Sequence, residues 1–191
     1  MQIGLFFGSF NPIHTGHLII ANHIINETAL KKIWFVVSPQ NPFKSEGSLL
    51  DEYNRLHLVR LAIEDDARLK AIDIEFHLPR PSYTAITLAN LSEKYPQNTF
   101  SVIMGSDSFG NLHKWKNFET IIKNYTLYIY KRPGIEAENK KIKVDPVIIH
   151  SPLIEISSTT IRKLMKEGKA IRYLVPDKVM EEINRGGYYR K

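Results

Sequence analysis

Short, largely unbroken apolar runs alternate along the chain with segments of helical periodicity, and this alternation constrains the fold more than any other feature. The apolar runs predict strands at 2–7, 32–38, 69–76, 99–107, 126–132 and 146–151. Helices are expected at 17–30, 50–66, 84–96, 115–125, 157–168 and 176–187. Apolar strands that do not alternate with polar residues are typical of parallel sheets covered on both faces. The sequence therefore predicts an α/β fold, with a doubly wound parallel sheet and with helices at the C-terminal end of the chain.

The length and the residue types fit one domain and exclude several kinds of site. A chain of 191 residues is long enough for a single domain with a sizeable core. It has no cysteine, which excludes a disulfide framework, a cysteine-ligated zinc site and thiol catalysis. No run approaches the roughly 18 apolar residues that a membrane span needs, and the first residues do not resemble a signal peptide. We therefore expect a cytoplasmic protein with no membrane partner.

The basic excess lies in the C-terminal third of the chain. The net formal charge is +6, and residues 1–130 carry 12 basic and 12 acidic side chains, so residues 131–191 supply the whole excess. This region is where a polyanion would bind, although a solvated helical surface explains the same charge. Basic residues are not interleaved with aromatic residues in any stripe, and no nucleic-acid reader motif is present. We expect no nucleic-acid partner.

The stretch GSFNPIHTGH, residues 8–17, joins the first predicted strand to the first predicted helix. Gly8 and Ser9 let the backbone pass close to a ligand, and a helix that begins near Gly16 offers unpaired N–H groups that suit a phosphate. His14 and His17 can both donate hydrogen bonds to one anion. Loop packing and metal ligation are the alternatives for such a pair, and no third cluster of metal ligands is evident. We interpret the stretch as an anion-binding loop and expect no metal held by protein ligands alone.

A second stretch with the same chemistry is ISSTTIR, residues 156–162. Ser157, Ser158 and Thr159 supply hydroxyls and backbone N–H groups at the start of a predicted helix, and Arg162 supplies a guanidinium fork for phosphate oxygens. The alternative is an ordinary helix cap with additional hydroxyls. Because this stretch occurs together with the first one, phosphate binding is favoured over a simple cap.

The two stretches resemble the signatures of the HxGH nucleotidyltransferases: GSFNPIHTGH is similar to GxFxPxHxGH, and ISSTTIR to ISSTxIR. Five further segments resemble the nicotinate mononucleotide adenylyltransferase family, namely SPQNPFK, NRLHLVRLAI, PRPSYTAITL, GSDSFGNLHKW and YKRPG, in that order. Two positions depart from the family pattern, because Asn54 stands where His is usual and Ile86 where an acidic residue is common. The resemblance implies a Rossmann-like fold and one nucleotidyltransferase domain over residues 1–191.

The resemblance also implies the substrates and the site. The substrates would be ATP and nicotinic acid mononucleotide, and the products deamido-NAD and pyrophosphate. The catalytic residues would be His14, His17 and Arg162. The residues implied to bind ATP are Gly8, Ser9, Phe10, Gly16, Gly105, Asp107, Ser157, Ser158 and Thr159. Those implied to bind the mononucleotide are Lys44 at its phosphate, Thr84 and Ala85 at the pyridine carboxylate through backbone N–H groups, and Trp115 stacked on the ring.

Each assignment has a structural alternative. Asp107 could cap the following helix, Trp115 could anchor the core, and Lys44 could be a solvated loop charge. Lys114 and Lys116 are expected on the surface. The reaction itself needs no general base, because a phosphomonoester with a second pKa near 6 is already mostly dianionic at neutral pH. Mg²⁺ would arrive with ATP, held largely by phosphates and water.

Three alternatives stay open at this point. Nicotinamide mononucleotide could be the main substrate, since one negative charge separates the amide from the acid. Another member of the superfamily, such as phosphopantetheine adenylyltransferase, would share the two signatures. A nucleic-acid-binding module would share the high isoelectric point. The sequence also leaves the oligomeric state open, a homo-oligomer included.

Overall fold

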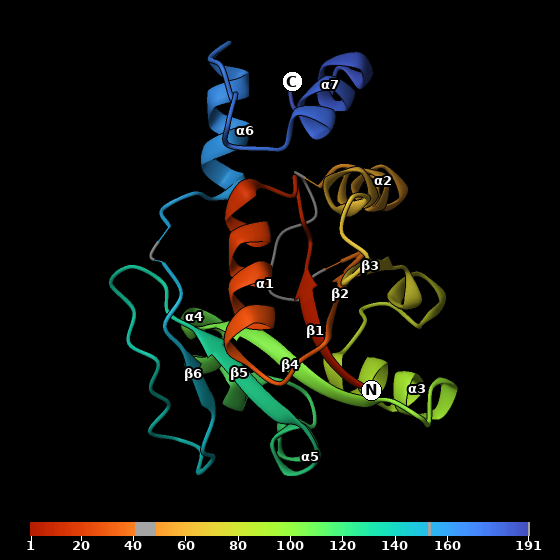
Figure 1. The fold of residues 1–191 in the computed structure, drawn as a ribbon, viewed down its shortest axis with the longest axis vertical. Coiled ribbons are helices and arrows are strands. Elements are labelled where there is room, and N and C mark those ends of the chain that lie inside the picture. The colour runs from red at the N-terminus through yellow and green to blue at the C-terminus, as the bar shows by residue number, and fades with distance from the viewer. Residues whose placement is uncertain (41–48, 153, 191) are drawn as a thin grey trace.

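A parallel sheet forms the centre of the molecule (Figure 1). The computed structural model describes residues 1–40, 49–152 and 154–190, and its sheet has six strands in the order β3-β2-β1-β4-β5-β6. Every neighbouring pair in this sheet is parallel. The strands are β1 (Gln2–Gly8), β2 (Lys32–Val37), β3 (Leu69–Ile72), β4 (Thr99–Gly105), β5 (Thr126–Tyr130) and β6 (Val147–Ile149).

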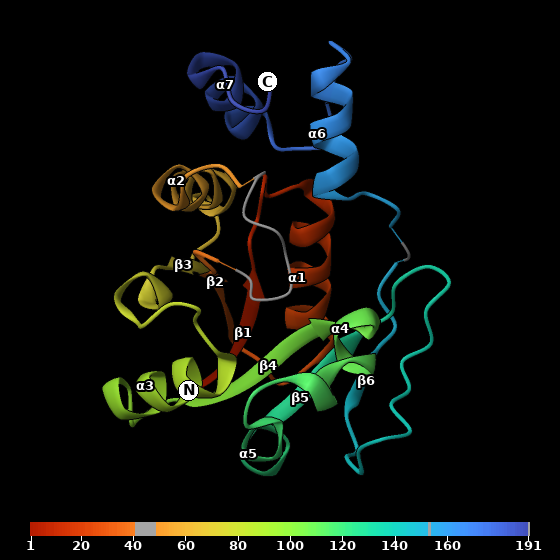
Figure 2. The same cartoon turned by 180° about the vertical axis from the view of Figure 1, so that it is seen from behind.

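Helices cover both faces of the sheet, so each face has its own hydrophobic core (Figures 1 and 2). Phe6 belongs to the core under α1 (Thr15–Glu27) and α2 (Glu52–Ile63), while its neighbour Leu5 belongs to the core under α3 (Thr84–Lys94) and α5 (Phe118–Asn124). Successive side chains of a strand point to opposite faces. Both faces are buried here, which explains why the strands are apolar throughout. The predicted doubly wound parallel sheet is confirmed.

The order of the strands reverses between β1 and β4. The chain runs outward from β1 through β2 to β3, returns to pair β4 with the other side of β1, and then runs outward again to β6. In open α/β sheets, ligands bind beyond the carboxyl ends of the strands at such a reversal. Here those ends are Gly8 of β1 and Gly105 of β4, and both glycines were singled out in the sequence.

Several predicted element boundaries are wrong. The strand expected at 69–76 ends at Ile72, and Ile74–His77 form the short 3-10 helix η2, which buries Glu75. The helix expected at 115–125 begins at Phe118, and two short helices precede it, α4 (Ser106–Gly110) and η3 (Leu112–Lys114). Strand β4 ends at Gly105 because the chain turns directly into α4. The start of α2 is fixed by a side-chain cap, because Asp51 accepts hydrogen bonds from the N–H groups of Tyr53 and Asn54.

The last two helices return to the N-terminal end of α1. They are α6 (Ser158–Lys166) and α7 (Asp177–Gly186), followed by Gly168 and Gly187 in the left-handed conformation that favours glycine (φ 66° and 63°). Both ribbon views place the start of α6 next to the start of α1 (Figures 1 and 2). The Ser158 hydroxyl donates to the Pro12 carbonyl at 2.9 Å. The two anion-binding stretches of the sequence therefore lie side by side.

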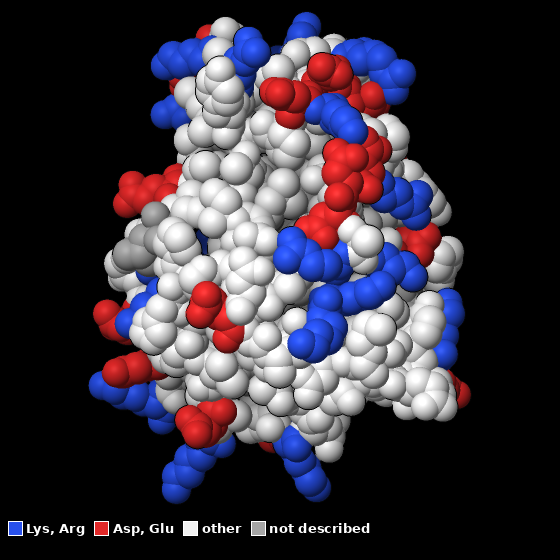
Figure 3. Space-filling view, viewed as in Figure 1, with Lys and Arg blue, Asp and Glu red and all other residues white. Residues whose placement is uncertain are grey.

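The C-terminal excess of basic charge is mixed with acidic side chains. On the face drawn in Figure 3, blue and red side chains alternate over α7 and α2. Lys178 of α7 pairs with Glu64 and Asp65 beyond α2, and Arg185 pairs with Glu182. Over α7 and α2, acidic side chains therefore interrupt the basic ones (Figure 3). Among the described helices, none is long and apolar enough to cross a membrane.

Candidate active site

A cleft of about 880 Å³ opens at the reversal of strand order, and we call it the main cleft. Its lining comes from both ends of the chain. The residues before position 110 that the sequence singled out are Gly8, Ser9, Phe10, His14, Gly16, His17, Gly105 and Asp107. Those from the rest of the chain are Trp115, Ser157, Ser158, Thr159 and Arg162. The structure therefore brings thirteen of the sixteen predicted site residues into one cavity.

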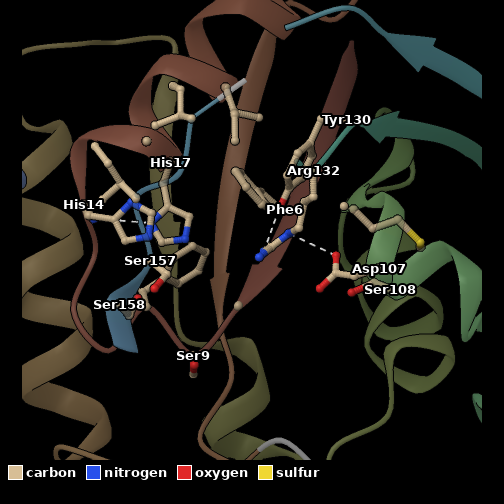
Figure 4. Close-up of a pocket in the computed structure, with 18 of the residues that line it drawn as sticks. Phe6, Ser9, His14, His17, Asp107, Ser108, Tyr130, Arg132, Ser157 and Ser158 are labelled. Carbon is tan, nitrogen blue, oxygen red and sulfur yellow. Dashed lines mark hydrogen bonds and ion pairs between the residues drawn. The ribbon is translucent and has the colours of Figure 1, made fainter. Parts of the chain in front are cut away.

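The two imidazoles form a stacked pair on one wall of the main cleft (Figure 4). Their ring centroids are 3.6 Å apart with an interplanar angle of 26°. The backbone N–H of His14 donates to Nδ1 of His17 at 3.2 Å, so a neutral His17 carries its ring proton on Nε2. Gly16 makes room for this arrangement, because a Cβ atom there would lie 3.1 Å from Nδ1 of His14. The local fold at the start of α1 thus sets the orientation of His17.

His14 is uncharged at neutral pH. Its pKa is lowered from 6.5 to about 4, because the ring is buried and because Arg132 adds positive charge nearby. A neutral ring stacks on His17 without the repulsion of two imidazolium ions. Neutral imidazole still carries one N–H donor. Both rings can therefore act as hydrogen-bond donors over the pH range in which the protein would work.

The Ser/Thr turn forms the adjoining wall, at the N-terminus of α6. The Ser157 hydroxyl accepts a hydrogen bond from the Thr160 N–H at 3.1 Å, so Ser157 caps the helix as the alternative interpretation foresaw. Arg162, one turn into the helix, donates to the Asn11 carbonyl at 2.7 Å. The guanidinium thus ties α6 to the loop that precedes His14. The positive end of a helix dipole and a cation in one wall give an anion-binding surface.

The opposite wall carries an ion pair that the sequence analysis did not foresee. Arg132, just after β5, lies with Nε 3.0 Å from Oδ1 of Asp107 in the first turn of α4, and it also donates to the Tyr130 hydroxyl (Figure 4). Gly105 permits this pair, because a Cβ atom there would lie 2.5 Å from Oδ1 of Asp107 and 2.8 Å from Nε of Arg132. Asp107 therefore faces the cleft together with a cation.

A smaller cavity of about 400 Å³ adjoins the main cleft, and we call it the side pocket. Its lining residues are Phe7, Gly8, Ser38, Gln40, Glu75, Ser82, Tyr83, Thr84, Ser108, Lys114, Trp115 and Lys116. Gly8 and Trp115 line both cavities, so the two meet at the end of β1. The predicted mononucleotide residues Thr84 and Trp115 lie here. Lys114 and Lys116 are exposed, as expected, but they also form part of the pocket rim.

A buried carboxyl group organises one side of the side pocket. Glu75 is 2% exposed and accepts hydrogen bonds from the hydroxyls of Ser82 at 2.8 Å and Thr87 at 2.9 Å. These two residues flank Tyr83 and Thr84, where α3 begins. Burial raises the pKa of Glu75 above its usual value. Glu75 therefore fixes the helix start at which the pyridine carboxylate is expected.

Among the sixteen predicted site residues, Ala85 and Phe10 also contribute to the hydrophobic cores, and Lys44 is not described. Ala85 lines neither cavity and packs partly buried against the core beneath α3, so only its backbone could serve a ligand. Phe10 lines the main cleft but is also 2% exposed, with its ring 5.1 Å from that of His17. Lys44 lies outside the described residues.

Three residues of the site were missed by the sequence analysis. Arg132 follows the carboxyl end of a strand within the segment YKRPG, a position that could have indicated a cleft residue. Arg55 stands beside the Asn54 departure in NRLHLVRLAI, and it is 1% exposed. Glu75 was placed inside a strand and so received no role. Neither Arg55 nor Glu75 stands out in its segment, because the first segment also holds Arg60 and the second also holds Lys70 and Asp73.

The described side chains offer no ready-made metal cage. Among residues 1–40, 49–152 and 154–190, no group of three or more His, Cys, Asp or Glu side chains is placed to hold a metal ion. The main cleft does contain the carboxylates of Asp107 and Glu155. Mg²⁺ commonly binds through one or two carboxylates together with substrate phosphates and water. The cleft fits that mode of binding.

Comparisons with known proteins agree with this geometry. The model of the cytidylyltransferase-like family matches residues 5–164. A protein of Flavobacterium johnsoniae named "probable nicotinate-nucleotide adenylyltransferase" is 52% identical, with all of both chains covered. One of the same name from Bacteroides thetaiotaomicron is 44% identical over 96% of this chain and 91% of its own.

A solved structure shows the same fold at low sequence identity. The Plasmodium falciparum nicotinic acid mononucleotide adenylyltransferase complexed with NaAD superposes with a TM-score of 0.81 at 21% identity, covering 98% of this chain and 97% of its own. The Rossmann-like fold is thereby confirmed. From the family model and the full-length relatives, the chain belongs to the cytidylyltransferase-like family and, within it, to the nicotinate-nucleotide adenylyltransferases.

Proposed function

We propose that the protein transfers the adenylyl group of ATP to nicotinic acid mononucleotide, which yields deamido-NAD and pyrophosphate. One observation carries the proposal: His14, His17 and the Ser157–Arg162 stretch line one cleft, and a second pocket opens from that cleft beside Trp115. Two adjoining cavities suit two substrates. The first has the donors that a triphosphate requires, and the second has an aromatic wall and a helix start for the pyridine ring.

The mononucleotide supplies the nucleophile. An oxygen of its phosphate forms a bond to the α-phosphorus of ATP, and the bond from that phosphorus to the bridging oxygen of the β-phosphate breaks, so pyrophosphate leaves with the electron pair. The phosphate is mostly dianionic at neutral pH, so no side chain must remove a proton. The obstacle is repulsion between two anions. Positioning can contribute roughly 7–11 kcal/mol against such a barrier.

The donors on the two walls of the main cleft oppose this repulsion. His17, with its proton on Nε2, and neutral His14 donate hydrogen bonds to phosphate oxygens as charge develops in the transition state. Arg162 adds a fixed positive charge. The N-terminus of α6 holds the terminal phosphates through Ser158 and Thr159, and Gly105 with Asp107 lies toward the adenosine.

The side pocket favours the acid over the amide. The N-terminus of α3 at Thr84 and Ala85 suits a carboxylate, and Lys114 and Lys116 add positive charge at the rim. Trp115 stacks on the pyridine ring. Glu75 lines the same pocket, where burial raises its pKa and the hydroxyls of Ser82 and Thr87 donate to its carboxyl oxygens.

Mg²⁺ enters the proposal as the partner of ATP. Asp107 and Glu155, the carboxylates in the lining of the main cleft, would support it through water. The ion offsets negative charge on the phosphates. Orientation of the reacting groups still comes from the side chains described above.

The test is a pyrophosphate-release assay with ATP and Mg²⁺ and one acceptor at a time. The acceptors are nicotinic acid mononucleotide, its amide and phosphopantetheine. We expect kcat/KM to be highest for the acid mononucleotide. α,β-Methylene-ATP is the control, because it can fill the same cleft and its bridge between the α- and β-phosphorus atoms does not break. Release with phosphopantetheine and with neither pyridine compound would refute the proposal.

A further inference from the structure

The Arg55 side chain connects the carboxyl ends of β1 and β2. It lies in the first turn of α2 and is 1% exposed. Its Nη1 donates to the carbonyl oxygens of both Ser9 and Ser38 at 2.7 Å. Nη2 donates to the Pro39 carbonyl at 3.0 Å, and Nε to the Leu50 carbonyl at 2.7 Å. Four of the five N–H groups of the guanidinium thus donate to main-chain oxygens from three segments.

These carbonyls lie where the sheet stops. Strands β1 and β2 pair as far as Gly8 and Val37, and the Ser38 N–H still donates to the Gly8 carbonyl at 2.9 Å. Beyond that point the two chains diverge, and their next carbonyls need donors from elsewhere. Buried carbonyls without donors are costly. Arg55 supplies those donors and so replaces the next rung of the ladder.

The two residues whose carbonyls share Nη1 of Arg55 line different cavities. Ser9 lines the main cleft, and Ser38 lines the side pocket. Arg55 itself lines neither, so it does not touch either proposed substrate. Burial lowers the pKa of its guanidinium, but arginine keeps its charge in proteins. Hydrogen bonds from a charged donor are about twice as strong as neutral ones, which suits a rigid connection.

We infer that Arg55 is a positioning residue that sets the spacing between the two substrate sites, by holding the Ser9 and Ser38 carbonyls on one guanidinium nitrogen. The inference rests on the proposed adenylyl transfer. Each cavity keeps its own lining without Arg55. The mononucleotide phosphate comes from the side pocket and the α-phosphorus of ATP lies in the main cleft. The distance and angle between them depend on how the loops that follow β1 and β2 are joined.

The first test is Arg55→Lys with Arg60→Lys as the matched control, since Arg60 is an exposed arginine of the same helix. A lysine head is compact and lacks the planar fork, so it cannot serve all four carbonyls. A misplacement of about 1 Å costs on the order of 10²-fold in rate. We expect kcat to fall about 10–100-fold in Arg55→Lys, with each KM within about threefold of the wild-type value. Arg60→Lys should match the wild type.

Binding measurements separate spacing from general damage. α,β-Methylene-ATP occupies one site and nicotinic acid mononucleotide the other, whereas deamido-NAD must occupy both at once. In Arg55→Lys, the Kd of each single-site ligand should stay near the wild-type value, while the Kd of deamido-NAD should rise by about tenfold. A residue that merely stabilises the fold would weaken all three ligands alike.

A second variant keeps the inference open to refutation if Arg55→Lys is unstable. Arg55→Ala leaves a hole into which guanidinium ion at low concentration can bind, and the ion should restore kcat without changing KM. Unchanged kcat in Arg55→Lys, equal weakening of all three ligands, or absence of rescue would each overturn the inference. If the wild-type protein releases no pyrophosphate with either pyridine mononucleotide, the proposed function fails first, and the inference falls with it. An active wild type with an unaffected variant refutes the inference alone.

Discussion

The imidazoles at the start of α1 are oriented by their immediate neighbours in sequence. His17 receives its hydrogen bond from the backbone of His14, and the two rings stack three residues apart. A spacing of three residues at a helix start is enough to produce this pair, because residues i and i+3 lie on the same face of a helix. The residue types and their spacing could therefore predict the pair before any tertiary contact was known.

Replacing His17 tests the role of the donor on Nε2. In His17→Ala, we expect kcat to fall by on the order of 10²–10³, the loss typical of one donor to the transition state. The thermal midpoint should stay close to that of the wild type. The matched control is His23→Ala on the same helix, outside the lining of both cavities. Near wild-type turnover in His17→Ala would show that the ring does not act on the reacting phosphates.

The buried His14 makes stability depend on pH. Its pKa is about 4 in the folded protein against 6.5 as the ordinary value, so between these values the unfolded chain binds a proton that the folded chain does not. The free energy of unfolding therefore keeps the contribution of neutral His14 above pH 6.5 and loses it as the pH falls toward 4. We expect about 2 kcal/mol of loss between pH 6.5 and pH 5 from this group.

Urea unfolding at several pH values measures this loss. The loss of stability should be smaller in His14→Asn than in the wild type, because position 14 then has no group that titrates in this range. In His23→Asn the loss should equal that of the wild type. An equally steep pH dependence in His14→Asn and the wild type would show that other groups cause it.

At the scale of elements, helix starts are the parts that face the two cavities. Strands β1 and β4 end at glycines, and α1, α3 and α6 begin at the edges of the two cavities. The sequence predicted these starts within a few residues, because capping residues and glycines act locally. It placed the end of β3 and the start of α5 wrongly, because the apolar residues of Ile74–His77 and 106–117 fit a strand or a helix equally well until their burial is known.

Substitutions of Ser157, which caps α6, can test protein stability and ATP binding separately. Ser157→Ala removes the side-chain acceptor of the Thr160 N–H and should cost about 1 kcal/mol of unfolding free energy. Ser157→Asn and Ser157→Asp are both good caps and should restore stability. The aspartate variant alone adds a negative charge beside the proposed triphosphate site, so its KM for ATP should rise well above that of the asparagine variant. Equal KM values in the two would place the phosphates away from α6.

At the scale of the whole molecule, the main cleft joins segments that are far apart in the chain. Arg162 donates to Asn11, Ser158 to Pro12, and the Thr15 N–H donates to the Leu174 carbonyl at 2.9 Å. Residues from both ends of the chain therefore line the main cleft together. The two stretches predicted to bind anions line one cleft only because α6 folds back over α1.

Hydrogen exchange can test this closure. Binding of α,β-methylene-ATP with Mg²⁺ should slow exchange both in the loop that leads into α1 and in the first turn of α6. A ligand at 100 times its Kd stabilises the folded state by about 2.7 kcal/mol, so the protection should be easily measured. Protection confined to residues before 110 would show that α6 takes no part in the ATP site.

The sequence alone determined the family, the doubly wound sheet and thirteen of the residues that line the main cleft. Their roles in binding and catalysis stay predictions until the variants above are measured. These features were readable because motifs, caps and the apolar pattern depend on neighbours close in the chain.

The tertiary structure alone decided that Arg132 faces Asp107, that Glu75 fixes the start of α3, and that Arg55 holds Ser9 and Ser38 together. Arg55 lies 46 residues from Ser9, and its partners are backbone carbonyls, which every residue has. No pattern of side chains in the sequence can predict such a contact. The N–H donors of Arg55 are needed only where the folded sheet ends and its strands diverge.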